Sequence, residues 1–94
     1  MEMIQVNHIL VKTEEEAKKL KAEIKDGEDF AKKAKEVSLC ASGKNGGRLG
    51  QFYKGELKDD VFEKAAFALE PGEISAPVKT KDGWHLIYIS GKQY

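Results

Sequence analysis

The chain has 94 residues, 40% of them hydrophobic, and its 16 basic and 16 acidic side chains cancel. This length is enough for one compact domain with a single modest core and too short for two. A whole-molecule field that would attract nucleic acid or an anionic membrane is therefore not expected, and the only arginine is Arg48. We expect residues 1–94 to form one domain that binds neither nucleic acid nor membrane.

Cysteine usage and the N-terminal sequence bear on the compartment. Cys40 is the single cysteine, so an internal disulfide is impossible and the fold does not depend on an oxidising compartment. The first residues contain no basic region followed by a long apolar stretch, and no apolar run approaches the length of a membrane span. We expect a cytoplasmic protein, and a monomer because there is no heptad pattern. A domain cut from a longer exported protein is the main alternative.

The first half of the chain predicts one strand and two helices. Residues 4–11 alternate and then become continuously apolar, which is typical of a strand buried on both faces. Thr13 and Glu16 form a capping-box pattern at the start of a helix, which Asp26-Gly27 is expected to stop. A second helix is predicted from residue 28 to about residue 37.

The second half predicts three strands and one helix. Residues 39–50 contain four glycines and cannot form a regular helix. Asp60 is expected to cap a third helix, which Pro71 ends. Short runs read as strands at residues 49–53, 74–79 and 84–90. The order β-α-α-β-α-β-β predicts an α+β domain with a small, mainly antiparallel four-stranded sheet flanked by helices.

The two histidines, His8 and His85, lie in apolar strand-like runs near opposite ends of the chain, and Cys40 lies between them beside the glycine-rich segment. A polar ring in an apolar strand needs a hydrogen-bond partner. If the two strands are neighbours, each imidazole can be the partner of the other, with the thiol nearby. By themselves these residues favour a histidine pair that only locks two strands and a cysteine that packs as a small hydrophobe. Trp84, one residue before His85, is expected on the opposite face of the sheet.

Five blocks of residues, which span nearly the whole chain, carry a family resemblance. They are residues 8–11, 29–38, 42–52, 62–69 and 77–87. Together and in this order they resemble the parvulin family of peptidyl-prolyl cis/trans isomerases, in a stand-alone single-domain form. The resemblance implies catalysed rotation about the peptide bond before proline, in peptides and unfolded protein segments, which assists protein folding without a cofactor or a metal.

The resemblance also implies site residues. His8 and His85 match the family's paired histidines, and Cys40 matches a position that is cysteine in many members and aspartate in others. Because a carboxylate also serves there, we expect a non-covalent mechanism in which Cys40 tunes the electrostatics at the substrate carbonyl. Thr80 matches a polar residue that hydrogen-bonds within the histidine network. The residues that match the apolar pocket for the prolyl ring are Leu49, Phe52, Leu57 and Phe62.

Substrate preference is predicted from the segment after the first strand. In phosphorylation-directed parvulins a long basic loop lies there, whereas here Lys12 leads straight into Thr13. A preference for phosphoserine or phosphothreonine before proline is therefore not expected. Glu56 and Asp82, if they lie near the groove, favour an apolar or basic residue before the proline.

Three other functions remain open on the residues alone. Cys40 with a histidine as base is the arrangement of a thiol enzyme. His8, His85 and Cys40 are also three residues of metal-binding type, although they lack the closely paired spacing of dedicated zinc sites. The third alternative is a peptide-binding or chaperone module that keeps the pocket and lacks turnover.

Overall fold

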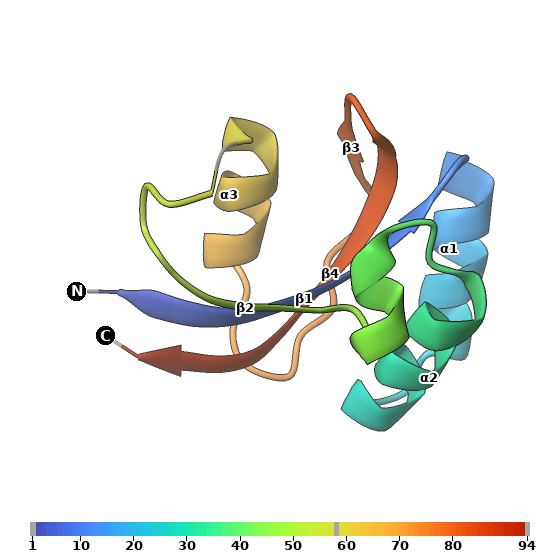
Figure 1. Cartoon of the computed structure of the whole chain (residues 1–94), viewed down its shortest axis with the longest axis horizontal. Coiled ribbons are helices and arrows are strands. Elements are labelled where there is room, and N and C mark those ends of the chain that lie inside the picture. The colour runs from blue at the N-terminus through green and yellow to red at the C-terminus, as the bar shows by residue number, and fades with distance from the viewer. Residues whose placement is uncertain (1, 58, 94) are drawn as a thin grey trace.

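The computed structural model describes residues 2–57 and 59–93. The elements within these residues are β1 (Met3–Val11), α1 (Glu14–Glu23), α2 (Gly27–Val37), the 3-10 helix η1 (Ala41–Asn45), β2 (Arg48–Tyr53), α3 (Asp60–Phe67), β3 (Val78–Thr80) and β4 (Gly83–Gln93). The described strands form one antiparallel sheet in the order β2-β1-β4-β3 (Figure 1). The predicted α+β class and order of elements are confirmed, with η1 added inside the glycine-rich segment.

The start of α1 follows the predicted capping box, whereas the boundary between α1 and α2 differs from the prediction. Thr13 Oγ1 accepts a hydrogen bond from the Glu16 amide at 3.2 Å. Asp26-Gly27 does not stop α1, because the helix already ends at Glu23. Asp26 instead caps the start of α2 by accepting a hydrogen bond from the Asp29 amide at 2.8 Å. Gly27 is the first residue of α2, where a Cβ atom would lie 2.7 Å from the Tyr88 hydroxyl.

Three further boundaries differ from the prediction, the first being the end of α3, which lies at Phe67 rather than at Pro71. The cap of α3 is Asp59 rather than Asp60, since Asp59 Oδ1 accepts hydrogen bonds from two amides of the first turn, at 2.9 and 3.1 Å. The strand expected at residues 74–79 is confined to Val78–Thr80. Pro77 has no amide hydrogen to donate, and the hydroxyl of Ser75 takes the place of a backbone acceptor for the Ile87 amide at 2.9 Å.

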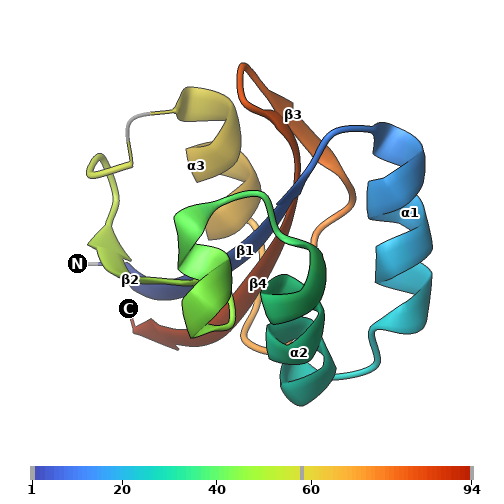
Figure 2. The same cartoon turned by 45° about the vertical axis from the view of Figure 1, so that its right-hand side comes forward.

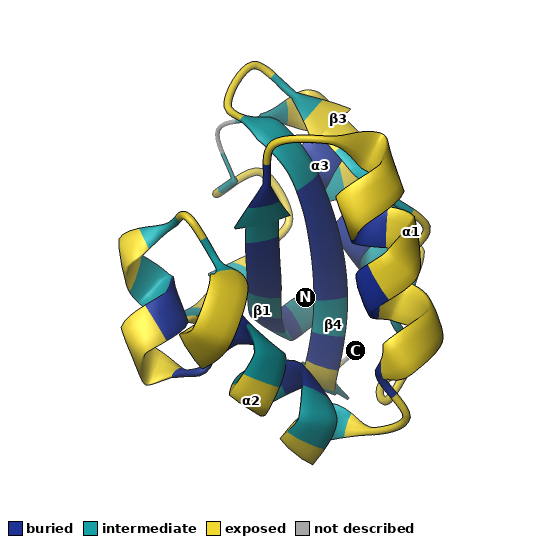
Figure 3. Ribbon diagram, turned by 90° about the vertical axis from the view of Figure 1, so that its right-hand side faces the viewer, coloured by how far each residue is buried: buried dark blue, intermediate teal, exposed yellow. Residues whose placement is uncertain are grey.

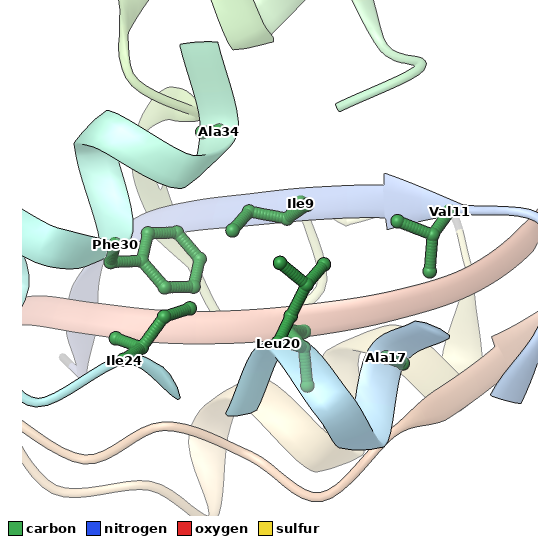
Figure 4. Close-up of a cluster of buried hydrophobic side chains, with 8 residues drawn as sticks. Ile9, Val11, Ala17, Leu20, Ile24, Phe30 and Ala34 are labelled. Atoms are coloured by element: carbon green, nitrogen blue, oxygen red, sulfur yellow. The ribbon is translucent and has the colours of Figure 1, made fainter. Parts of the chain in front are cut away.

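Helices cover both faces of the sheet (Figures 1 and 2). Helices α1 and α2 lie on one face and α3 lies on the other. Successive side chains of a strand point to opposite faces, so β1 and β4 contribute to two hydrophobic clusters, and Figure 3 shows their buried middle parts. The cluster under α1 and α2 consists of Ile9, Val11, Ala17, Leu20, Ile24, Phe30, Ala34 and Leu86 (Figure 4). The cluster under α3 consists of Ile4, Val6, Phe62, Ala66, Ile87 and Ile89. The prediction that the first strand is buried on both faces is confirmed.

The length and polarity of the helices bear on membrane insertion. Across residues 2–57 and 59–93, none of the helices combines the length and the apolar character that crossing a bilayer requires.

Candidate active site

His8 and His85 face each other from the two central strands. Their Nδ1 atoms lie 2.9 Å apart, and the rings are stacked with their centroids at 5.1 Å. Both side chains are buried. In the antiparallel pairing of β1 and β4, His8 lies opposite Ile87, which belongs to the cluster under α3. His85 precedes Ile87 by two residues, so both histidines lie on the sheet face that α3 covers. Trp84 packs against the cluster on the opposite face. The predicted neighbourhood of the two strands and the predicted orientation of Trp84 are both confirmed.

Each imidazole has a second partner on its outer side. His8 Nε2 lies 3.0 Å from the Ser42 hydroxyl, and His85 Nε2 lies 2.7 Å from the Thr80 hydroxyl. The Thr80 hydroxyl oxygen also accepts a hydrogen bond from the Asp82 amide at 3.2 Å. A neutral imidazole carries one N–H, so one ring donates to the other through Nδ1, and the receiving ring donates from Nε2 to its own hydroxyl. All four ring nitrogens are thereby satisfied, and the residues form a continuous chain from Ser42 to Thr80.

Both histidines are held in the neutral state. Burial, together with a smaller effect of the nearby His85, lowers the pKa of His8 to about 4. Burial also lowers the pKa of His85, although Asp82 and Asp59 act in the opposite sense. At neutral pH the pair is therefore uncharged and serves as a relay of hydrogen bonds rather than as a cation.

A small hollow lies over the histidine pair. Its volume is about 190 Å³. Phe62 stands edge-on to both imidazoles, at centroid distances of 5.8 Å from His8 and 5.3 Å from His85. The residues that line this hollow, which we call the histidine hollow, are His8, Leu49, Leu57, Asp59, Phe62, Thr80, Asp82 and His85. The histidine hollow has a short apolar wall, a polar floor and two carboxylates at its margin.

A β-bulge aims Leu49 into the histidine hollow. Val6 pairs with Gly50 and Asn7 pairs with Arg48, so Leu49 has no partner on β1. In a regular strand Leu49 and Phe52, three residues apart, would point to opposite faces. Both instead pack against the cluster under α3. An inserted residue re-aims the side chains around it, and here the bulge brings Leu49 to the face of the two histidines.

The predicted pocket residues are brought together except for one. Leu49, Leu57 and Phe62 line the histidine hollow, and so does Thr80. Phe52 does not belong to that lining, and it packs half-buried against the core under α3. It lies opposite Ile4 on β1, four residues from His8, which corresponds to roughly 13 Å along a strand.

Cys40 lies apart from the hydrogen-bonded chain. Its side chain is partly exposed, and the residue precedes η1 as its N-cap. Within the described residues the hydrogen bonds of Cys40 are made by its backbone, with Ser38 and Gly43, and the lining of the histidine hollow does not include it. The partner of His8 on this side is Ser42, two residues further along. Over the same described residues there is no group of three or more His, Cys, Asp or Glu side chains that could hold a metal ion.

Sequence reasoning missed two residues of the site. Ser42 lies inside the glycine-rich segment, where a single hydroxyl residue gives no spacing signal. Asp59 is both the N-cap of α3 and a lining residue of the histidine hollow. An aspartate before an amphipathic segment predicts a helix cap, but it does not predict which other residues the cap lies beside in the folded chain. Glu56 precedes Leu57 of the hollow and accepts a hydrogen bond from the Tyr53 amide at 2.6 Å. Asp82 lines the hollow as expected.

The fold and the site together define a parvulin-type domain. Residues 6–91 match the Rotamase family, described as the PPIC-type PPIase domain. The chain belongs to this family of peptidyl-prolyl cis/trans isomerase domains, as the sequence resemblance implied.

Known proteins that resemble the chain fall into longer and shorter kinds. It is 53% identical over 89 residues to the foldase protein PrsA of Clostridium botulinum, covering 94% of this chain and 27% of that protein. A SurA-like chaperone structure from Campylobacter jejuni superposes with a TM-score of 0.92 at 39% identity, over 98% of this chain and 39% of that one. The solution structure of NmPin, the parvulin of Nitrosopumilus maritimus, has a TM-score of 0.78 at 42% identity, over 97% and 98% of the two chains. The chain thus spans about a quarter of the length of the curated foldase and nearly all of a short parvulin.

Proposed function

We propose that this domain accelerates rotation about X-Pro bonds by a non-covalent mechanism, with proline-containing segments of unfolded proteins as its substrates. The observation that carries the proposal is the histidine hollow, an apolar recess of about 190 Å³ over an uncharged imidazole pair. Foldase and chaperone relatives support an assisting role in folding when the domain is part of a longer protein. A cytoplasmic location and a monomeric state stay predictions.

The chemistry of rotation matches an apolar recess. Amide resonance sets a barrier of roughly 20 kcal/mol, and no bond is made or broken on the way. In the twisted state the amide loses resonance and its carbonyl loses charge separation, so a site drier than water favours that state over both planar ones. Leu49, Leu57 and Phe62 would hold the prolyl ring while the preceding residue turns.

The hydrogen-bonded chain from Ser42 to Thr80 would act as a positioning device. Its members fix the two rings and leave no unsatisfied ring nitrogen facing the substrate. The thiol of Cys40 lies outside the lining of the hollow. That placement supports a mechanism without attack by sulfur.

The charges at the rim support a preference for the residue before proline. Asp59 and Asp82 line the histidine hollow, so a phosphate or carboxylate on the preceding residue would meet two like charges. A lysine there would meet opposite charges. We therefore expect apolar or basic residues before proline to be favoured and phosphoserine to give no gain.

The first experiment tests the recess. NMR exchange on Ala-X-Pro-Ala peptides gives kcat/KM for the protein and for Leu57→Ala, with Leu39→Ala as the matched control. Leu57 lines the hollow, whereas Leu39 is 56% exposed on the surface. Loss of the Leu57 side chain should lower kcat/KM about tenfold, from the apolar contact it removes, and the control should keep full activity. Equal activity of the two variants would remove the recess from the mechanism.

The second experiment tests the charges. The peptide panel carries lysine, leucine, glutamate or phosphoserine before proline, and the variant is Asp59→Asn, since asparagine preserves the N-cap of α3. Asp60→Asn is the control, because Asp60 belongs to the same helical turn and does not line the hollow. The advantage of lysine over glutamate should shrink in Asp59→Asn alone. A phosphoserine peptide that is turned over fastest would contradict the proposed preference.

A further inference from the structure

A second hollow, larger and basic, lies beside the histidine hollow at the β2 edge of the sheet. Its volume is about 630 Å³. Residues of α2, η1 and β2 line it, and Figure 2 shows these three segments next to one another. Its lining, which we call the basic hollow, consists of Ala31, Lys35, Lys44, Asn45, Gly46, Arg48, Leu49 and Gly50.

The charges in the basic hollow are all of one sign. Lys35, Lys44 and Arg48 line it, and no acidic side chain does. None of the three is in an ion pair with another described residue. The chain as a whole has a formal net charge of zero, so three unpaired cations around one recess are a local concentration of positive charge. A recess of this kind raises the local concentration of anionic groups.

The two hollows share one lining residue. Leu49 lines both, because the bulge places it where the sheet edge separates α3 from α2 and η1. Gly46 and Gly50 contribute no side chain to the wall between the cations, and a Cβ at Gly50 would meet nothing within 4 Å. An extended peptide lying over Leu49 would therefore pass from the carboxylates of Asp59 and Asp82 to the three cations.

We propose that the basic hollow binds an acidic side chain of the same substrate segment whose proline occupies the histidine hollow. This inference rests on the proposed isomerase function and adds a second determinant of substrate choice. Lys44 and Arg48 recognise the carboxylate, and the opposite charges at the two hollows fix the direction in which the peptide lies. The acidic residue belongs a few positions from the proline, since an extended chain advances about 3.3 to 3.6 Å per residue.

The expected effect is moderate and sensitive to salt. Exposed ion pairs contribute little singly, and two acting together should raise kcat/KM by about three- to tenfold at low ionic strength, mainly through KM. The gain should decline as salt is added, because the Debye length shortens.

The test compares glutamate with glutamine at single positions of one peptide. Glutamate is placed in turn at each of the four positions on either side of Leu-Pro, leaving out the residue before proline, and the ratio of kcat/KM for each Glu and Gln pair is measured by NMR exchange. Within each protein the ratio cancels any general change of activity. The variants are Lys44→Gln/Arg48→Gln and, as a matched control of equal charge, Lys21→Gln/Lys25→Gln, which are exposed residues in the last turn of α1 and in the segment that follows it.

The protein and the control should show a Glu-over-Gln ratio of about three or more on one side of the proline only, and the Lys44→Gln/Arg48→Gln variant should bring it close to one. A ratio of one at every position in the unmodified protein, with the Gln peptides turned over normally, overturns the inference and leaves the isomerase function intact. If no peptide is turned over, the proposed function fails, and the inference about the basic hollow is then tested by peptide binding alone. In that case the amide signals of Gly46 and Gly50 should shift more with the Glu peptide than with the Gln peptide, and equal shifts would overturn it.

Discussion

The backbone of Gly47 holds the backbone of His8. The His8 amide donates a hydrogen bond to the Gly47 carbonyl at 2.8 Å. Gly47 has a φ of 85°, and a Cβ there would overlap the His8 carbonyl oxygen and approach the Ala34 side chain at 3.2 Å. The glycine-rich segment thus supports the first histidine by close backbone contact, which no residue with a side chain allows.

Gly47→Ala should therefore destabilise the protein by more than the cost of placing an alanine at a positive φ. A positive φ costs an alanine about 1 kcal/mol, and the overlap with His8 should bring the total loss of stability above about 2 kcal/mol. Gly72→Ala is the control, because Gly72 also has a positive φ of 91° but open space around it. Urea unfolding and kcat/KM measure the difference. Equal losses in the two variants would show that the contact with His8 is unimportant.

The neutral histidine pair should make stability fall in mild acid. Burial lowers the pKa of His8 to about 4 in the folded protein, against 6.5 for an unperturbed histidine. Between these two pH values His8 is protonated in the unfolded chain and neutral in the folded protein. The contribution of neutral His8 to the free energy of unfolding is therefore complete above about pH 6.5 and is lost as the pH falls towards 4. The contribution of His8 is on the order of 3 kcal/mol, and His85 acts in the same direction.

The measurement is urea unfolding at several pH values between 4 and 7.5. In the variant His8→Phe/His85→Phe the carboxylates still titrate but the buried imidazoles are gone, so its stability should depend less steeply on pH in this range. Identical pH profiles of the two proteins would mean that the pair does not titrate differently on folding.

Thr80→Val should disturb His85 without enlarging the site. The substitution removes the hydroxyl that lies 2.7 Å from His85 Nε2 and accepts from the Asp82 amide. Leaving a ring nitrogen unsatisfied should cost about 1 to 3 kcal/mol of stability and lower kcat/KM. Thr80→Ser keeps the hydroxyl and should restore both. The imidazole ¹⁵N shifts of His85 report its tautomer, and unchanged shifts in Thr80→Val would contradict the role of Thr80.

Cys40→Asp should retain substantial activity. Cys40 is the N-cap of η1 and makes no side-chain cap hydrogen bond, whereas aspartate is among the residues preferred at such a position. The thiol is not part of the lining of the histidine hollow, so its loss should lower kcat/KM by less than about tenfold. A larger loss, together with a covalent adduct trapped on Cys40 by mass spectrometry, would establish a nucleophilic thiol.

The local signals in the sequence predicted the elements well because their causes are local. Thr13 caps α1 through an amide three residues away, and the alternation of Ile4 to Val11 places side chains on two faces whatever the rest of the chain does. The errors arose where a residue has two possible local roles. Asp26 could end one helix or begin the next, and the core position of Ile24 decided it.

The candidate site was predicted in part, through the family resemblance rather than through local signals. His8, His85 and Thr80 are joined because their strands pair, which the resemblance already implied. Ser42 and Asp59 come from a loop and a helix cap, and their approach to the histidines depends on how η1 and α3 dock.

Periodicity and caps predicted the order of the elements and the faces of the central strands, and the five blocks of residues that resemble the parvulin family predicted the family. Only the folded chain decided that a bulge turns Leu49 inward, that Ser42 rather than Cys40 completes the polar chain, and that acidic and basic recesses adjoin. These features depend on register and docking between segments distant in sequence, where a shift of one residue reverses the direction of a side chain.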